Sequence, residues 1–305
     1  MKFAWAACKT TGAVVLCIAS AAISVGARPD TATYRQTVEK WRQAYEAQLK
    51  SDTGWLTVSG LFWLHEGANT FGSGPLNDIV LPASAPASAG SFQFHLGRTI
   101  VHVQPGVTAL LDGKPTEAAE MHPDSNADQL AIGDLTLFVH ASGDRCTIRL
   151  RDKNSRLRKD FTGTRWFPVD ESYRVTAQYV PYDPPKQIEI QNVMGDTLQE
   201  TILGYAAFSL HGQALRLDAE DNGSGLSVVF RDLTSGKETY AASRFLEADP
   251  PKDGRVVLDF NQAYNPPCAY NSYTTCPLPP PQNRLAVRVE AGEKTYHHAA
   301  GEPVH

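Results

Sequence analysis

The hydrophobic and polar residues follow a helical period first and an alternating period afterwards. Large side chains recur at three- and four-residue spacing, as on one face of a helix, at Tyr34, Val38, Trp41, Tyr45 and Leu49. Gly54 ends this pattern in the way that glycine commonly ends a helix. We therefore predict one amphipathic helix over residues 31–50, packed against the sheet that follows it.

From Trp55 onward, apolar and polar residues alternate, as expected for short strands with one buried face. Turn signals such as Asp112-Gly113 and Asn222-Gly223 separate these segments. The predicted strands are Asp78–Leu81, Ser91–His95, Thr99–Val103, Val107–Leu111, Leu130–His140, Arg145–Arg151, Ser172–Tyr179, Gln187–Val193, Leu203–Leu210, Gln213–Asp218, Leu226–Arg231, Val256–Phe260 and Leu285–Ala291. Many short strands and a single helix predict a mainly β protein, a sandwich or barrel of antiparallel sheets.

A break near residues 163–170 divides the alternating pattern into two parts of similar size. We therefore expect two β domains, or two β layers of one domain. The expected segments are a signal peptide at 1–27, an N-terminal helix plus sandwich-like β domain at 28–165, a C-terminal β domain with a long Pro/Cys loop at 166–296 and a flexible tail at 297–305.

The first residues have the three parts of a secretory signal peptide. Lys2 and Lys9 are positive, residues 12–24 are largely apolar, and Val25-Gly26-Ala27 is the small-residue pattern that precedes cleavage. The apolar run is shorter than the about 20 residues that span a membrane. We expect cleavage after Ala27, a periplasmic or secreted location and no membrane span in the mature chain.

Charge narrows the range of partners. The formal net charge is −5 at pH 7, and the loss of Lys2 and Lys9 with the signal peptide makes the mature chain more acidic. Nucleic acid is not an expected partner, since its phosphates require clustered Lys and Arg. One basic stretch is interpreted as a solvated hairpin end, with an anion site as the alternative. It consists of Arg149, Arg151, Lys153, Arg156, Arg158 and Lys159.

The segment from Leu258 to Leu285 is the most unusual part of the chain, because it combines six prolines with asparagines, tyrosines and two cysteines. Ordered loops of this length are commonly functional, and prolines restrict such a loop to few conformations. We therefore predict that a small polar or anionic ligand, a metabolite or a glycan, binds at the Asp259–Asn283 loop. The ligand-binding candidates are Asn261, Tyr264, Tyr270 and Asn283.

Two cysteines lie in this loop, Cys268 and Cys276, eight positions apart. Disulfides persist in exported proteins, so a bridge between the two is the favoured interpretation. A metal pair and a reactive free thiol are the alternatives. Zinc needs about four ligands, and no Cys-x-x-Cys or spaced histidine pair lies nearby.

A second hypothesis is a carboxylate-dependent hydrolase. Asp259 can act as a general base if burial raises its pKa, assisted by Arg244 or Glu293. Each group also has a structural interpretation: Asp259 and Asn261 can satisfy the loop backbone, and Arg244 can pair with Asp259 or Glu293. A third hypothesis is a structural or partner-docking envelope protein, with no pocket at the loop.

The familiar catalytic motifs are missing from the sequence. The chain has no Gly-x-Ser-x-Gly elbow, no His-Glu-x-x-His, no phosphate-binding P-loop and no dinucleotide fingerprint. These absences argue against nucleotide-dependent chemistry, and we expect neither a cofactor nor a metal. A hydrolase built from dispersed residues stays open, because such sites are spatial.

Two resemblances add to these expectations. The segments SGLFWLHEGANTFGSGPLNDIVLP, FTGTRWFPVDESYRVTA, FRDLTSGKETYAASRFLEA and DFNQAYNPPCAYNSYTTCPLPPPQNRLAVRVEAGEK resemble a bacterial family known as domain of unknown function 1684. The resemblance covers nearly the whole mature chain and implies no activity. FGSGPLNDIVLP and LLDGKP resemble the strand and turn order of forkhead-associated sandwiches. The phosphothreonine-binding residues of those modules have no counterparts here, so this likeness implies the fold alone.

Overall fold

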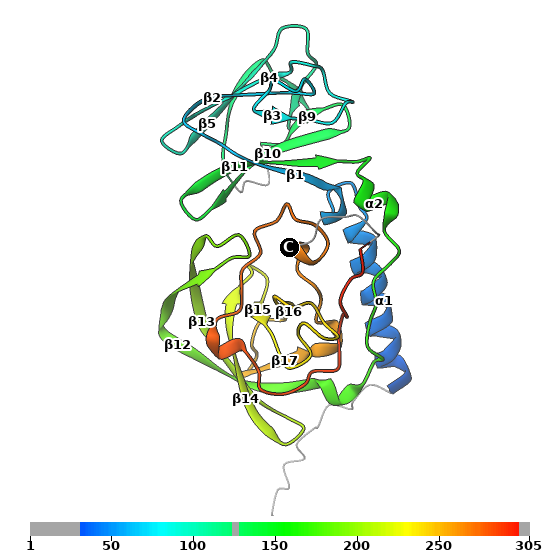
Figure 1. Ribbon diagram of the computed structural model, residues 1–305. Coiled ribbons are helices and arrows are strands. Elements are labelled where there is room, and N and C mark those ends of the chain that lie inside the picture. The colour runs from blue at the N-terminus through cyan, green and yellow to red at the C-terminus, as the bar shows by residue number, and fades with distance from the viewer. Residues whose placement is uncertain (1–30, 124–127, 299–305) are drawn as a thin grey trace, which may run out of the picture.

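The computed structural model describes residues 31–123 and 128–298 (Figure 1). The expected signal peptide lies outside these residues. The described chain is mainly β, as predicted, with two α-helices, α1 (Thr31–Leu49) and α2 (Arg156–Asp160), and three sheets. No helix in these residues is long and apolar enough to cross a membrane.

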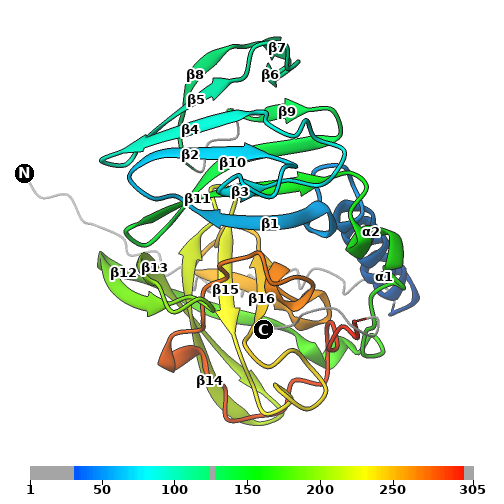
Figure 2. The same cartoon turned by 45° about the horizontal axis from the view of Figure 1, so that its top comes forward.

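The N-terminal half contains two sheets that enclose one core. The first has the order β1 (Val58–Trp63), β11 (Arg145–Asp152), β10 (Leu135–Ser142), β9 (Leu130–Ile132), β6 (Leu110–Leu111), β7 (Lys114–Pro115). The second has the order β3 (Ile79–Val80), β2 (Gly67–Gly72), β4 (Gly90–His95), β5 (Arg98–Val103), β8 (Ala118–Met121). Phe71 and Phe92 from the second sheet share a core with Leu137 and Ile148 from the first. Figure 2 shows these strands above the C-terminal half.

The C-terminal half is one sheet curled into a half-barrel. Its order is β16 (Arg244–Ala248), β15 (Leu226–Phe230), β14 (Gln213–Asp221), β13 (Thr197–Leu210), β12 (Arg174–Gln191), β17 (Arg255–Asp259). The register shifts between Pro181 and Lys186 and between Ile202 and Gly204. Such irregularities increase the local twist and bend, which is how a long sheet curls around its own core.

The last part of the chain is irregular and covers the open side of this half-barrel (Figure 1). It holds three single-turn helices at Phe260–Gln262, Pro267–Ala269 and Pro281–Asn283. The predicted strand Leu285–Ala291 is wrong. Its alternate residues are buried, including Leu285 and Val287, but the segment is held by loop contacts such as the Leu233 amide to the Val287 carbonyl rather than by a ladder. The alternation of apolar and polar residues in this segment therefore reflects which side chains are buried, and it does not indicate a strand.

Other boundaries also differ from the prediction. Leu130–His140 is two strands, because Gly133 has a φ of 58° and forms the turn between β9 and β10. The segments Ser172–Tyr179 and Gln187–Val193 belong to the single strand β12. Strands β1, β2, β7, β8 and β16 were not predicted.

Helix α1 packs on C-terminal residues. The Tyr34 hydroxyl donates to both oxygens of Asp259 at 2.8 and 2.9 Å, and the Arg42 guanidinium donates to the Asn261 carbonyl at 3.1 Å. The predicted helix face is confirmed, with Tyr34 and Val38 buried. The helix therefore positions the start of the long loop.

Candidate functional site

The predicted binding loop lies mostly inside the protein. The exposed fractions of Asn261, Tyr270 and Asn283 are 0%, 1% and 2%. The Asn283 amide accepts from the Asp218 N–H and donates to the carbonyls of Asp218 and Val229. Its hydrogen bonds satisfy the backbone where the loop has no ladder partner. Asn283 therefore stabilises the loop.

Asn261 has the same role at the start of the loop. Its side-chain oxygen accepts from the Asp170 N–H at 3.0 Å, and its NH₂ donates to the Asp170 carbonyl at 2.8 Å and to the Tyr34 hydroxyl at 2.9 Å. These bonds join the loop to the segment before β12 and to α1.

Asp259 also takes part in the contacts that join the start of the loop to α1. Besides the Tyr34 hydroxyl, it accepts from the Asn261 backbone N–H at 3.1 Å, and its side chain is 12% exposed. Burial, together with the charge of Asp259, raises the pKa of Tyr34. Among the described residues no hydrogen bond or ion pair joins Asp259 to Arg244 or Glu293. The three catalytic candidates are thus not brought together around Asp259.

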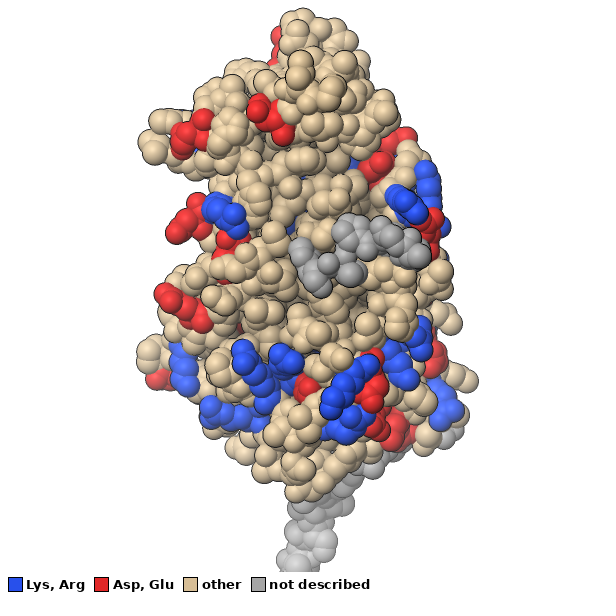
Figure 3. All heavy atoms as spheres, in the orientation of Figure 1, with Lys and Arg blue, Asp and Glu red and all other residues tan. Residues whose placement is uncertain are grey.

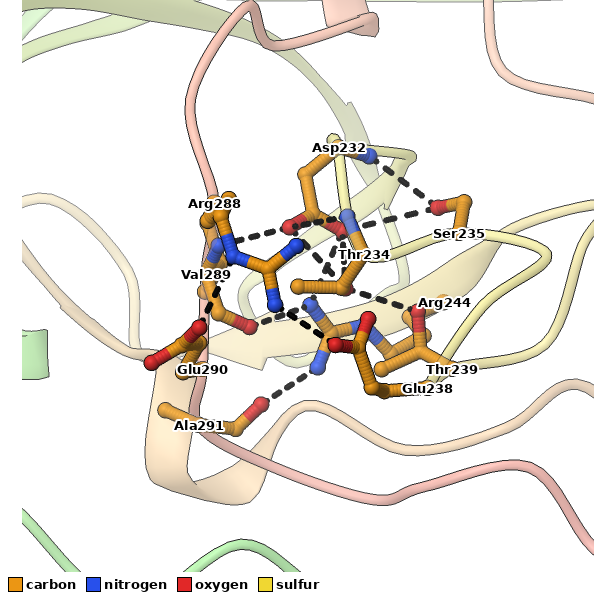
Figure 4. A network of polar contacts seen from close by, with 10 residues as sticks. All are labelled: Asp232, Thr234, Ser235, Glu238, Thr239, Arg244, Arg288, Val289, Glu290 and Ala291. Carbon is orange, nitrogen blue, oxygen red and sulfur yellow. Dashed lines mark hydrogen bonds and ion pairs between the residues drawn. The ribbon is translucent and has the colours of Figure 1, made fainter.

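Arg244 forms a buried ion pair with Asp232 and not with Asp259 or Glu293, so the predicted partners are wrong. The Nη2–Oδ1 distance is 3.2 Å, and both side chains have 0% exposure. The guanidinium also donates to the carbonyls of Val289 and Ala291, as Figure 4 shows. Phe230 lies 5.1 Å from it, ring centroid to guanidinium carbon.

Asp232 is equally well satisfied. It accepts from the Thr234 hydroxyl at 2.8 Å and from the Val289 N–H at 2.6 Å. Asp232 also closes the Asp-x-Thr-x-Gly turn by accepting the Thr234 N–H. Arg244 and Asp232 therefore join β16, this turn and the C-terminal segment.

Glu293 is fully buried in a network of phenols. It accepts from the Tyr270 hydroxyl and from the Asn265 N–H at 2.8 Å, and Tyr45 lies 3.1 Å from Tyr270, oxygen to oxygen. Burial raises the pKa of Glu293 to about 8. The sequence did not indicate this network, because Tyr45 is more than two hundred residues from its partners.

Both loop cysteines are free thiols in the structure, so the predicted bridge is not formed in it. The Cys268 N–H donates to the Cys276 sulfur at 3.3 Å. The hydrogen bond with Cys276, together with burial, raises the pKa of Cys268. Burial alone would raise the pKa of Cys276, but its hydrogen bonds with Cys268 and Thr274 outweigh burial and lower that pKa. The two sulfurs share one buried site.

A cavity beside the loop has a volume of about 640 Å³, and we call it the basic cavity. Arg165, Lys237 and Lys294 line it together with Cys268 and Ala269 of the loop. Backbone hydrogen bonds bring these segments side by side: the Lys294 N–H donates to the Arg165 carbonyl at 2.7 Å, and the Thr295 N–H to the Glu238 carbonyl at 3.0 Å. Three distant segments thus supply one cationic site.

The predicted basic stretch is not one solvated surface, and this interpretation is wrong for Arg149. That side chain is 5% exposed within β11, and its guanidinium lies 5.6 Å from the Trp55 ring centroid. Lys153 and Arg158 both pair with Asp52. Arg149 lies inside the strand that alternation predicted at Arg145–Arg151, so its position in the strand and not its charge decided its burial.

The predicted tail contains at least one packed residue. His298 lies 3.0 Å from the Ala269 carbonyl oxygen through its Nε2, and its ring meets Tyr296 edge-on at 4.9 Å. Residues 299–305 lie outside the described chain. Within the described part, no group of His, Cys, Asp and Glu is arranged to hold a metal ion.

The fold and the buried loop define a mainly β protein whose long C-terminal segment is locked by internal polar contacts. Residues 159–294, which contain that segment, match the family described as "Protein of unknown function (DUF1684)". The chain belongs to this family. The match covers three of the four resembling segments and not nearly the whole chain, since SGLFWLHEGANTFGSGPLNDIVLP lies before it.

Two solved structures are similar in part. The uncharacterized protein from gene locus rrnAC0354 of Haloarcula marismortui is 36% identical, over 45% of this chain and 79% of that one, with a TM-score of 0.39. The FhaA FHA domain, solved with the intracellular domain of Rv3910, is 14% identical over 30% of this chain and 97% of that one, with a TM-score of 0.22. At these TM-scores neither structure defines the fold of this chain. No curated protein matches the sequence.

Proposed function

We propose that this protein is an exported binding protein for a small anionic ligand, held in the basic cavity beside the long loop. One observation carries the proposal: Arg165, Lys237 and Lys294 all belong to the lining of one concave site in a chain of net charge −5. The predicted export and the predicted ligand class are both part of this proposal.

No ion pair with a described residue neutralises Arg165, Lys237 or Lys294 in the basic cavity. Among the described residues that line this cavity, Glu238 is the only carboxylate, and Glu238 already pairs with Arg288 at 2.7 Å. Within the described chain, Arg165, Lys237 and Lys294 take part in no ion pair, although the Lys294 ammonium lies 4.4 Å from the Phe167 ring centroid. Lys and Arg side chains gather over the lower half of the face in Figure 3. Uncompensated cations in a concavity attract and retain anions.

The dimensions and donors fit a metabolite-sized ligand. Small-molecule sites commonly enclose about 300–1,000 Å³, and the basic cavity has about 640 Å³. Arginine binds carboxylates or phosphates with two parallel hydrogen bonds, and lysine adds a point charge. Cys268 and Ala269 belong to a proline-led turn, so this part of the wall is ordered before binding.

The other two hypotheses receive less support. Asp259 holds α1 and the loop together, and it is not among the residues that line the basic cavity. Glu293 is fully buried, and its carboxyl group already accepts hydrogen bonds from Asn265 and Tyr270. A purely structural role predicted no pocket at the loop, whereas Cys268 and Ala269 line one. Binding therefore accounts for more of the observations than hydrolysis or scaffolding.

We expect the variant Arg165→Gln/Lys237→Gln/Lys294→Gln to lose affinity for the anion that the protein binds best. A charged hydrogen bond contributes about 1.5 kcal/mol or more, so each substitution should weaken binding about tenfold. Calorimetric titration with inorganic phosphate, citrate, glucose 6-phosphate and uncharged glucose measures this.

The matched control is Lys114→Gln/Arg216→Gln/Lys252→Gln, which removes the same charge from exposed residues outside the basic cavity. The control should bind as the unaltered protein does. Equal weakening in both variants would show that only overall charge matters, and binding of glucose alone would reject an anionic ligand.

Export and the Cys268–Cys276 bridge can be tested together. We expect mass spectrometry of the mature, non-reduced protein to give a chain that begins at Arg28 and lacks alkylatable thiols at Cys268 and Cys276. The shared site of the two sulfurs supports the bridge. A retained N-terminus would reject cleavage, and two alkylated loop cysteines would reject the bridge.

A further inference from the structure

A second cavity lies between α1 and the long loop, with aromatic walls. Its volume is about 310 Å³, and we call it the aromatic cavity. Its walls include Trp41, Tyr45, Trp55 and Tyr264, with Glu247 and Asn265 as polar members of the lining. None of the described residues that line it is a lysine or an arginine, which distinguishes it from the basic cavity.

The rings form an angled enclosure rather than a single stack. Trp41 and Tyr45 lie one helical turn apart, with an interplanar angle of 4° and ring centroids 5.6 Å apart. Tyr264 is inclined to both by 52° and 51°, at 6.3 and 5.1 Å. The faces of aromatic rings carry partial negative charge, so converging rings favour a positively charged group.

Glu247 adds a full negative charge at this enclosure. Its carboxylate accepts from the Tyr264 hydroxyl at 3.0 Å and from the Ser227 hydroxyl at 3.2 Å. Within the described residues it has no lysine or arginine partner. Burial, together with the charges of Glu200 and Glu247, raises the pKa of Glu220 to about 7. Glu220 and Glu247 therefore repel each other, and no ion pair compensates Glu247 within the described residues.

Among the described residues no hydrogen-bond donor reaches the buried side-chain oxygen of Asn265, which is a second and independent observation at this cavity. The residue is 1% exposed, and its NH₂ donates to the Lys294 carbonyl at 2.8 Å. Its side-chain oxygen is buried and accepts no hydrogen bond in the described chain. Buried acceptors of this kind are costly unless a donor reaches them, and Asn265 belongs to the lining of the aromatic cavity.

We propose that the aromatic cavity binds a small organic cation of the alkylammonium class. The ammonium group lies against Trp41, Tyr45 and Tyr264, and Glu247 balances its charge. Asn265 accepts from a hydroxyl or N–H of the same ligand. Trp55 lines the cavity but is not assigned to the ammonium group. The Arg149 guanidinium carbon already lies 5.6 Å from the centroid of that ring.

Calorimetric titration with choline and with 3,3-dimethyl-1-butanol tests the proposal, because the second compound has nearly the same shape and no charge. Choline should bind about tenfold more tightly or better, owing to the rings and the carboxylate. Saturable binding of the two compounds with equal affinity would mean a merely apolar cavity. Absence of choline binding, or saturable binding of glucose in its place, would also overturn the assignment.

Two variants locate the binding. Tyr264→Leu and Glu247→Gln should each weaken choline binding on the order of fivefold to tenfold. Tyr264→Phe keeps the aromatic ring and should retain most of the affinity. This variant separates the contribution of the ring from that of the hydroxyl, which donates to Glu247. Circular dichroism confirms that each variant is folded. Unchanged choline affinity in folded Glu247→Gln would contradict the role of that carboxylate.

Two controls separate this site from the basic cavity. Glu189→Gln removes an exposed carboxylate of β12 that lies outside the aromatic cavity, and it should bind choline normally. The basic-cavity variant Arg165→Gln/Lys237→Gln/Lys294→Gln should also bind choline normally. Loss of choline binding in either control would assign the effect to overall charge or to the other cavity.

Discussion

Replacing Arg244 with methionine is expected to lower the free energy of unfolding by about 3–5 kcal/mol, the range found when one partner of a buried ion pair is removed. The substitution leaves the fully buried carboxylate of Asp232 without its counter-charge. It also leaves the carbonyls of Val289 and Ala291 without the guanidinium that donates to them. The C-terminal segment should loosen first, because these contacts hold it against β16.

Urea unfolding followed by tryptophan fluorescence measures this effect. The control is Arg216→Met, which removes an exposed arginine that lies 5.2 Å from the Tyr205 ring centroid. Exposed charges contribute about 0–1 kcal/mol, so the control should change little. Asp232→Asn/Arg244→Met should recover part of the loss, since no buried charge is left alone. Equal stability of Arg244→Met and the control would contradict the role of the pair.

The second large effect expected is a loss of stability between pH 5 and pH 8. Burial raises the pKa of Glu293 from 4.5 to about 8, so the folded state holds a proton that the unfolded state releases in this range. The stability linked to Glu293 is therefore complete below about pH 4.5 and is lost as the pH rises through 8. One proton corresponds to a slope of about 1.4 kcal/mol per pH unit.

Glu293→Gln tests this assignment, because the amide cannot ionise. The variant should match the unaltered protein near pH 5, exceed its stability at pH 9 and show a flatter profile between. The neighbouring phenols do not titrate in this window, since burial raises the pKa of both Tyr45 and Tyr270 above the ordinary value. Glu117→Gln, an exposed control, should keep the original slope. An unchanged slope in Glu293→Gln would assign the pH dependence to other groups.

The sequence predicted the class of fold because burial patterns are local. The face of α1 and the alternation of β5, β10 and β13 are visible in a few neighbouring residues. Alternation does not report hydrogen-bond partners, however. Leu285, Val287 and Val289 are buried like a strand and yet lie in an irregular segment. Only the tertiary structure shows that the loop at Leu233 takes the place of a ladder.

The site was predicted less well for the same reason. The long loop was found from composition, but Asn261 and Asn283 stabilise it instead of facing a ligand. The cations of the basic cavity come from segments near residues 165, 237 and 294, and no local motif connects them. Their meeting depends on the pairing of residue 294 with residue 165.

The most direct test of the central claim is to locate a bound anion in the mature protein. Crystals soaked with sodium selenate at millimolar concentration, measured at the selenium absorption edge, give its position. We expect the strongest anomalous peak in the basic cavity, within hydrogen-bond reach of at least two of Arg165, Lys237 and Lys294. An empty basic cavity, with selenate only at other surfaces of the molecule, would contradict it.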